Sequence, residues 1–396
     1  MKTLPDNPNL DHLRRQAKDL LAGLREGRRS ATLADAQASL AERYGFRTWT
    51  DLKAEVDRLT LRADVADPEL ARAVASCFDL GSVTGPMRSV ARPDDMGRRW
   101  SLETDRGRWA VRTVDGWLPI VPAERDVALQ EAAAAAGVLL PPPVRSRSGS
   151  VVEEVGGHRW RVHGWDRSGP SLVAPVSAGV AHAVGGVLAT IHGLRLPVDR
   201  VSPYHSMRLV ETARAVPEHE WAGLAATAAA RRAGWASALG EAIPKLTGLE
   251  QVGDGTSAPP AVLTHNNLMP GSVRQGPEGR LVVVGWEHAG GQPPSWELGS
   301  ALLHWTVAPG EGVHRAAARA LLDGYRSTAG ALPPLDLTMF RGAVTGLCNY
   351  VWAQVEEALA AVGREEQRHT ARNVRHLLTH LPSRTDLERL LDVTVA

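Results

Sequence analysis

Polar side chains gather in one short stretch of this sequence, residues 262–273, which reads VLTHNNLMPGSV. An apolar strand end leads into His265, Asn266 and Asn267, and a Pro-Gly turn then leads to Ser272. The stretch has the shape of a catalytic loop, but Asn267 carries an amide, which can orient a hydroxyl group and cannot take its proton. Its residue types therefore indicate a polar loop that lacks the carboxylate base needed for proton transfer.

A second group of candidates follows in residues 282–299, which read VVVGWEHAGGQPPSWELG. Mg²⁺ in phosphate-binding sites is usually held by one or two carboxylates together with the phosphates. Gly285 ends the apolar run and offers no side chain to a metal. Glu287 lies two residues on, on the same face of an extended segment, where it could substitute as a metal ligand. We interpret it as an ordinary acid that does not compensate for the missing ligand.

Three helices are expected near the N-terminus, well before the two polar stretches in the sequence. Residues 9–25 place leucines on one helical stripe. Two further helices open with Ser/Thr-type capping boxes, Thr32-x-x-Asp35 and Thr48-x-x-Asp51. These features predict a separate helical segment at residues 1–60.

Strands follow this segment, and helices come last. A helix starts at Asp67-Pro68, and residues 98–115, RRWSLETDRGRWAVRTVD, alternate apolar residues about a turn, which predicts a β-hairpin. Residues 123–138 predict another helix, and short strands complete the region 67–167. Residues 168–396 are dominated by predicted helices at 177–194, 219–243, 296–307, 311–329, 335–361 and 364–379. This order predicts an α+β protein in which a small sheet lobe is attached to a larger helical lobe.

The composition limits the class of partner. The chain has 396 residues and a formal net charge of +1, so no overall field favours nucleic acid or a membrane surface. Its two cysteines, Cys77 and Cys348, match no metal-ligand spacing and favour a reducing compartment. The N-terminus has no apolar signal-peptide core, and the apolar runs are too short to span a bilayer. We expect a soluble, cytoplasmic protein with no nucleic-acid or membrane partner.

Four stretches together resemble the aminoglycoside phosphotransferase and choline kinase family, small-molecule kinases related in fold to protein kinases. LETDRGRWAVR resembles the hairpin that ends in the family's phosphate-gripping basic residue, and LATIHGLRLP resembles its LxxLHxLxLP helix end. VLTHNNLMPGSV resembles H-G-D-x-x-x-x-N, and VVVGWEHAGGQPPSWELG resembles V-I-D-W-x-x-x-G-x-x-x-W-D-L. The resemblance implies a bilobal kinase-like fold over about residues 70–390. Residues 1–60 resemble the helical segment found ahead of ankyrin repeats in some bacterial proteins, although no repeat of roughly 33 residues follows.

The resemblance also implies roles for single residues. Asn267 stands where the family has its catalytic Asp, while Ser272 and Gly285 stand where it has the Asn and Asp that bind the metal. Arg112 replaces the phosphate-binding lysine, and Asp126 is expected as its helix partner in the nucleotide-binding part; a purely structural ion pair is an equal alternative. Because the base and both metal ligands are replaced, ATP and magnesium are disfavoured as cofactors.

Other candidates have a structural alternative beside the functional one. His265 occupies a position that supports the loop by hydrogen bonding, with a direct chemical role as the alternative. His163 and Trp165 lie where the hinge between the lobes would pass. Three tryptophans are candidates for substrate binding: Trp286, Trp305 and Trp352. Trp305 and Trp352 lie on predicted helices, where aromatic residues at helical spacing also predict core packing.

Three functions are consistent with the sequence, because a fold does not by itself carry a function. The first is a pseudokinase-like protein that binds a small molecule or nucleotide in the cleft between the lobes. The second is an active ATP-dependent O-phosphotransferase with an atypical site, in which Glu287 and Ser272 hold the metal. The third is an enzyme of another class that reuses the cleft. The N-terminal helices are a candidate protein-contact surface.

Overall fold

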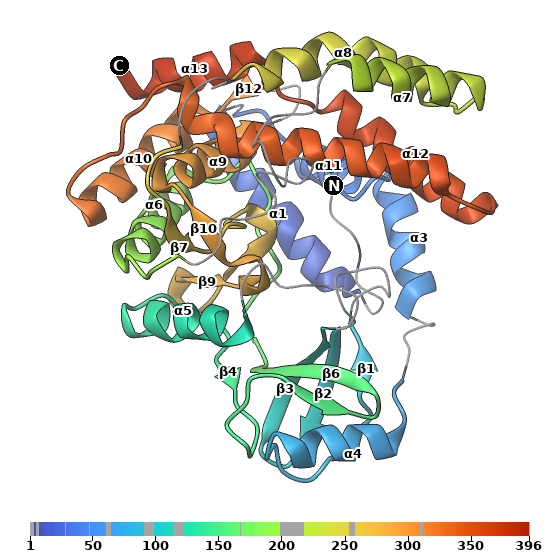
Figure 1. The fold of residues 1–396 in the computed structure, drawn as a ribbon, viewed down its shortest axis with the longest axis vertical. Helices are drawn as coiled ribbons and strands as arrows, with labels where there is room; N and C mark the ends of the chain where they lie inside the picture. Colours follow the sequence, from blue (N-terminus) through green and yellow to red (C-terminus); the bar gives the residue numbers. More distant parts are fainter. Residues whose placement is uncertain are drawn as a thin grey trace.

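The structure is a computed structural model, and it describes residues 4, 8–27, 29–46, 48–60, 65–90, 99–114, 122–166, 168–198, 218–252, 258–308 and 312–395. Figure 1 shows a β-rich small lobe at one end of the long axis, a helical large lobe at the other, and N-terminal helices beside the large lobe. The predicted α+β bilobal fold with an N-terminal helical extension is thereby confirmed.

The N-terminal helices form a unit with its own core. The unit comprises α1 (Leu10–Gly27), α2 (Leu33–Arg43) and α3 (Trp49–Thr60). The predicted capping box is present, because the Thr32 hydroxyl accepts from the Asp35 backbone N–H while the Asp35 carboxylate accepts from the Thr32 backbone N–H. Buried leucines and alanines from all three helices pack together, and they are joined by Val173 from a distant part of the chain.

The small lobe is built on one antiparallel sheet of six strands. Its order is β1-β2-β3-β6-β4, and β5 also pairs with β6. The predicted hairpin is confirmed as β2 and β3, with Thr104 opposite Gly107 at the turn. α4 (Pro68–Cys77) begins at the predicted cap, where Asp67 accepts from the Glu69 backbone N–H, and helps to form a second apolar core. The strand bounds are β1 (Arg88–Ser89), β2 (Arg99–Thr104), β3 (Gly107–Thr113), β4 (Pro143–Val144), β5 (Glu153–Val155) and β6 (His158–Gly164).

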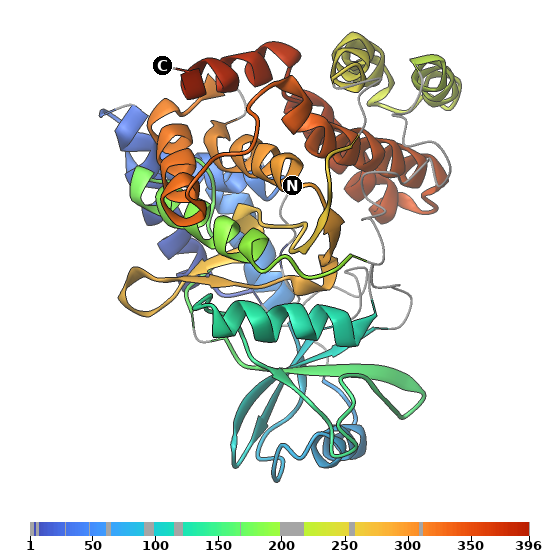
Figure 2. The same ribbon diagram turned by 60° about the vertical axis from the view of Figure 1, so that its left-hand side comes forward.

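α5 (Ala123–Ala135) lies between the sheet and the large lobe (Figure 2). The sequence places this helix with the small lobe, yet its buried Leu129 and Ala133 belong to the hydrophobic core of the large lobe. Gly137, two residues after the end of the helix, has a φ of +94°, which is readily adopted only by glycine. α5 therefore packs against both lobes and brings Asp126 to their boundary.

The large lobe is mostly helical and has the largest apolar core. α6 and α10 approach closely because Gly185 and Gly324 present no side chain at their contact, where a Cβ on either would collide with the backbone of the other helix. Among the described residues, no helix is both long and apolar enough to cross a membrane. The helices are α6 (Ala178–Gly193), α7 (Glu218–Ala230), α8 (Ala236–Glu250), α9 (Pro294–Thr306), α10 (Arg315–Ala329), α11 (Arg341–Ala360), α12 (Arg364–Thr379) and α13 (Arg384–Val395).

Two predictions for this lobe are corrected. The single helix predicted at 219–243 is two helices, α7 and α8, because the chain turns between them with Arg232 at a φ of +55°. α13 was not predicted, although Ser383 and Asp386 form a capping box just before it.

Short strands of the large lobe carry the polar stretches identified in the sequence. β7 (Val262–Thr264) pairs with β10 (Gly290–Gln292), and β8 (Val273–Gln275) pairs with β9 (Leu281–Val283). β11 (Val307–Ala308) and β12 (Gly312–Val313) form a separate pair. The loop after β7 runs directly into β8, and the turn after β9 leads into β10. The two strand pairings therefore place residues 265–272 and 284–289 next to each other.

Candidate active site

His265 holds the polar loop from inside. It is fully buried, and burial lowers the pKa of its ring. Its Nε2 lies 3.1 Å from the carbonyl oxygen of Val284, and its Nδ1 accepts from the backbone N–H of Asn267 at 3.2 Å. Both bonds are satisfied by a neutral ring protonated on Nε2. His265 thus ties the loop to the turn after β9 and fixes the backbone of Asn267.

Asn267, Ser272 and Gly285 lie together beside this histidine. Gly285 has a φ of +85°, and a Cβ built there would lie 3.2 Å from Ser272 Oγ and 3.7 Å from Asn267 Nδ2. The backbone N–H of Val284 donates to the carbonyl oxygen of Ser272 at 2.9 Å, which keeps the two segments in register. The three positions chosen from separate stretches of sequence therefore share one site, and none of them carries a carboxylate.

Three arginines form a row across the small-lobe sheet opposite these loops. Arg99 pairs with Arg112 in the β2–β3 register, and Arg112 pairs with Arg161 in the β3–β6 register. The Glu287 carboxylate lies 2.5 Å from Arg112 and 3.2 Å from Arg99. Asp126 of α5 accepts two bonds from Arg161, at 2.7 and 3.0 Å. Two acids from two different elements thus offset part of the positive charge of the row.

The predicted pairing of Arg112 with Asp126 is wrong. Asp126 binds Arg161, one strand further along the sheet, while Arg112 binds Glu287 from the large lobe. The sequence reasoning assumed that the lysine position would take the helix acid. The register of β6 instead places a second arginine nearer to α5, because Arg161 lies directly opposite Arg112.

The charges of this cluster are fixed by their surroundings. Burial raises the pKa of Glu287, but Arg112 and Arg99 more than offset this and hold its pKa well below the usual range. His163 lies on the same strand as Arg161, and burial together with the arginines lowers its pKa to about 3. His163 is therefore neutral and Glu287 ionised at neutral pH.

Comparison with known proteins decides the family. A model of the phosphotransferase enzyme family matches residues 93–331, which is more than half of the chain. The chain belongs to this family. A search of curated proteins found no match.

Solved structures of several small-molecule kinases share the fold. A spectinomycin phosphotransferase in complex with ADP and spectinomycin matches with a TM-score of 0.53 at 11% identity, covering 79% of this chain and 94% of that chain. An amicoumacin kinase in complex with AMP-PNP and Ca²⁺ gives 0.55 at 14% identity, covering 84% and 99%. A microcompartment-associated aminopropanol kinase gives 0.50 at 13% identity, covering 79% and 95%. At these identities the likeness shows the common fold alone.

The residues at the three converging positions do not fit the magnesium ion that the family resemblance implies. Mg²⁺ is usually held by carboxylates together with phosphates, whereas this site offers a hydroxyl from Ser272, an amide from Asn267 and no side chain from Gly285. The nearby carboxylate of Glu287 is already bound by two arginines. Among the described residues there is no cluster of three His, Cys, Asp or Glu side chains able to hold a metal.

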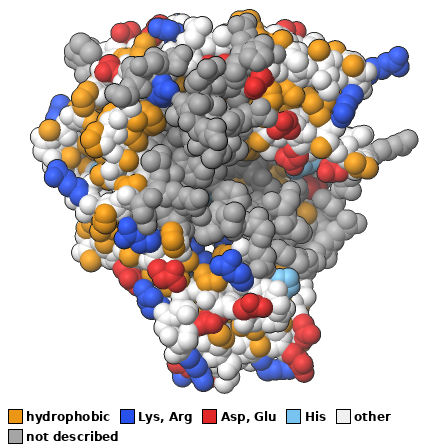
Figure 3. Space-filling view, in the orientation of Figure 1, with side chains coloured by type: hydrophobic (Ala, Val, Ile, Leu, Met, Phe, Trp, Pro, Cys, Tyr) orange, Lys and Arg blue, Asp and Glu red, His pale blue; other side chains and the backbone are white. Residues whose placement is uncertain are grey.

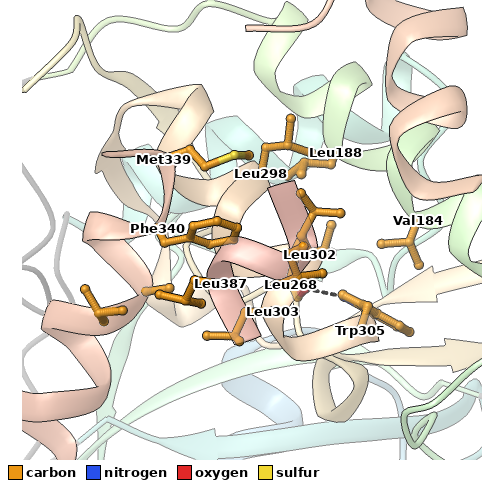
Figure 4. Close-up of a cluster of buried hydrophobic side chains, with 14 of the residues drawn as sticks. Val184, Leu188, Leu268, Leu298, Leu302, Leu303, Trp305, Met339, Phe340 and Leu387 are labelled. Atoms are coloured by element: carbon orange, nitrogen blue, oxygen red, sulfur yellow. Dashed lines mark hydrogen bonds between the residues drawn. The ribbon is translucent and has the colours of Figure 1, made fainter. Parts of the chain in front are cut away.

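The three tryptophans proposed to bind substrate are buried. Trp305 has no exposed surface, and its Nε1 donates to the carbonyl oxygen of Leu268 at 2.7 Å (Figure 4). Trp286 is 4% exposed and packs edge-on against His265. Trp352 is 6% exposed and packs edge-on against Trp221. In this structure they support the loop and the core, which for Trp305 and Trp352 is the alternative that their helical spacing also predicted.

Sequence reasoning missed two members of the arginine row, Arg99 and Arg161. Arg99 could have been found from the hairpin, because a turn at Asp105-Arg106 fixes the pairing of Arg99 with Arg112. Arg161 could not, since it depends on how β6 pairs with β3 across a long insertion.

On the face seen in Figure 3, acidic and basic side chains are interspersed over the small lobe.

Proposed function

We propose that this chain is a pseudokinase-like member of its family, which binds a small molecule or nucleotide between its lobes without transferring phosphate from Mg-ATP. The observation that carries the proposal is the convergence of Asn267, Ser272 and Gly285 with no carboxylate among them. Phosphoryl transfer relies on positioning and on metal ions that neutralise the phosphates. An amide in place of the base alone forfeits roughly 10²–10⁴ in rate.

The arginine row supports the same proposal. Arg112 remains able to hold a phosphate, because a guanidinium binds phosphate oxygens in a fork geometry. However, Glu287 already binds Arg112 and Arg99, so an incoming anion has to displace this carboxylate. Without a metal-binding carboxylate, free nucleotide binds at least as well as its magnesium complex.

A second candidate is an active phosphotransferase, because the similar structures include a spectinomycin phosphotransferase with ADP and a kinase with AMP-PNP and Ca²⁺. In that case Glu287 would leave both arginines and serve as the carboxylate of the metal site together with Ser272.

The cysteine content further supports a cytoplasmic location as part of the proposal.

Thermal unfolding with ATP, in the presence of either magnesium or a chelator, separates the two candidates. A ligand at about 100 times its Kd stabilises a protein by about 2.7 kcal/mol, which is a measurable rise in Tm. We expect any rise with ATP to be the same with and without magnesium. A rise that requires magnesium, accompanied by release of ADP, would establish the active phosphotransferase instead.

A further inference from the structure

The N-terminal unit lies along the segment that joins the two lobes. We call this segment, residues 165–177 between β6 and α6, the connection. Its described part extends beside β8, where the backbone N–H of Gly169 donates to Gln275 at 2.9 Å and that of Leu172 donates to Val273 at 2.8 Å. Because β8 begins directly after Ser272, the connection is bound to the strand that leaves the candidate site.

An ion pair strengthens this side of the connection. Arg274 of β8 lies 3.1 Å from the carboxylate of Asp166, and its backbone forms a bridge with Ser171. Asp166 in turn accepts from the backbone N–H of Ser168 at 2.8 Å. The connection is therefore held in place along the edge of β8.

α1 contacts the connection from another direction, with one face of the helix. Gln16 is 3% exposed, and its amide donates to the carbonyl oxygen of Ser171 while accepting from the Tyr44 hydroxyl at 3.0 Å. Gly23, two helical turns further on, faces Pro175 so closely that a Cβ would lie 2.5 Å from the Pro175 carbonyl oxygen. A side chain at position 23 is thus incompatible with this contact.

The end of α1 continues the same contact into the large lobe. The Glu26 carboxylate accepts from the backbone N–H of Ala178 at 3.2 Å, at the start of α6. It also lies 4.0 Å from His314, which caps α10. Val173 of the connection is buried in the core of the N-terminal unit itself. Part of the connection is therefore part of that core.

The small lobe is joined to the rest of the chain at two points, one after α3 and one through the connection. The chain leaves α3 at Thr60 and enters the small lobe at Val65, which pairs with Arg88. It leaves the small lobe through the connection. The N-terminal unit is also joined to the large lobe just after α12, where Glu42 lies 3.3 Å from His380. Both chain paths into the small lobe thus begin at elements packed against the large lobe.

We propose that the N-terminal unit is an intramolecular clamp, which fixes the connection and thereby limits how far the two lobes separate. The clamp acts through α1, whose contacts at Gln16, Gly23 and Glu26 follow the connection from Ser171 to Ala178. Since β8 is bound to the same segment, release of α1 also loosens the backbone that follows Ser272. The clamp rests on these contacts alone and is independent of whether the site transfers phosphate.

Hydrogen exchange of the full chain tests the clamp with a matched pair of substitutions in α1. Gly23→Ala forces a methyl group against the Pro175 carbonyl oxygen, whereas Gly27→Ala places one 3.9 Å from the nearest atom, in the His314 ring. Alanine raises helix propensity at Gly23 and less so at Gly27, the last residue of α1, so propensity alone would make Gly23→Ala the more stable variant. Overpacking at a close contact is destabilising, so we expect Gly23→Ala to speed exchange on the order of 5- to 30-fold in 168–177 and in β8. Gly27→Ala should leave both segments unchanged.

A second variant tests whether the faster exchange comes from loss of the contact with the connection or from general unfolding. Gln16→Leu removes the bonds to Ser171 and to the Tyr44 hydroxyl and keeps a side chain of similar size, so it too should speed exchange in the connection and β8. In both variants the β2–β3 hairpin should keep its protection, because its hydrogen bonds lie within the small-lobe sheet. Exchange that rises equally in the hairpin, or that stays unchanged in the connection while α1 becomes exposed, would show that the unit is not a clamp.

Discussion

Arg112 Nη1 lies 2.5 Å from Glu287 Oε1, and this contact joins the sheet of the small lobe to the polar loops of the large lobe. Both side chains are only 13% exposed, and Arg99 reaches the same carboxylate from the neighbouring strand. A carboxylate that could have replaced a lost metal ligand is here the counter-ion of the arginine that could bind phosphate. The two functions compete for one side chain.

Replacing Glu287 by Gln should destabilise the protein more than any comparable change at an exposed pair. Removing one partner of a buried ion pair costs about 3–5 kcal/mol, because the other charge is left buried. Arg99 is 43% exposed and can be hydrated, so we expect the lower end, about 3 kcal/mol, from chemical denaturation. Glu103→Gln is the control, since its carboxylate is 56% exposed and 3.8 Å from Arg108; its effect should stay within about 0.5 kcal/mol. Equal effects would show that Glu287 is not a buried counter-ion.

Stability should fall as the pH falls below about 6.5. Burial lowers the pKa of His163 to about 3 and that of His288 to about 4. Between pH 6.5 and 4 the unfolded chain therefore binds protons at these two rings that the folded chain does not bind. Below about pH 4.5, protonation of unfolded Glu287 adds to the loss, because its folded pKa is held lower. Each such proton changes stability by about 1.4 kcal/mol per pH unit. His163→Gln should reduce the slope between pH 6.5 and 4. An unchanged slope in His163→Gln would mean that this ring is protonated in the folded state.

Local signals in the sequence predicted much of the fold. The Thr32–Asp35 box, the Asp67 cap and the β2–β3 hairpin depend on neighbouring residues, and each is present where it was predicted. The break between α7 and α8 was not predicted, because it depends on a left-handed backbone conformation at Arg232. This conformation is uncommon for residues other than glycine, so the residue type does not indicate it. The glycine beside it, Gly234, faces Arg375 of α12, a partner more than a hundred residues away.

The candidate site was predictable where it follows single loops and not where it crosses between lobes. Asn267, Ser272 and Gly285 were found from two contiguous stretches, and they meet in space. The partner of Arg112 was not found, because Glu287 reaches it only through the packing of the large lobe against the sheet. Long-range pairing of this kind leaves no periodic signal in the sequence.

Trp305 should be required for the shape of the polar loop. Its ring is fully buried, and its Nε1 binds the carbonyl oxygen of Leu268, one residue after Asn267. Trp305→Phe leaves that oxygen without a donor and opens a cavity, at a cost of about 2–3 kcal/mol. Hydrogen exchange should rise in residues 266–270 before it rises in the rest of the large lobe. If stability falls while exchange in 266–270 stays the same, Trp305 acts on the core and not on the loop.

Restoring the family's residues should create a magnesium site. The variant Asn267→Asp, Ser272→Asn and Gly285→Asp places two carboxylates and an amide at positions that meet in this structure. Asp is among the few residues that tolerate the φ of +85° found at Gly285, although its Cβ would lie 3.5 Å from the Cβ of residue 272. We expect ATP to raise the Tm of this variant only when magnesium is present.

The matched control keeps Asn267→Asp and Ser272→Asn but carries Gly285→Ala. Alanine at this position brings the same Cβ without a carboxylate, so any loss of stability common to both variants does not come from the carboxylate at position 285. The difference between them isolates the carboxylate, which bridges metal and phosphates in a magnesium site. At about 100 times the Kd of the magnesium complex, the aspartate variant alone should gain about 2.7 kcal/mol. If the two variants respond alike to magnesium and ATP, position 285 is not the equivalent of the family's metal-binding Asp, and the assignment of the site has to be revised.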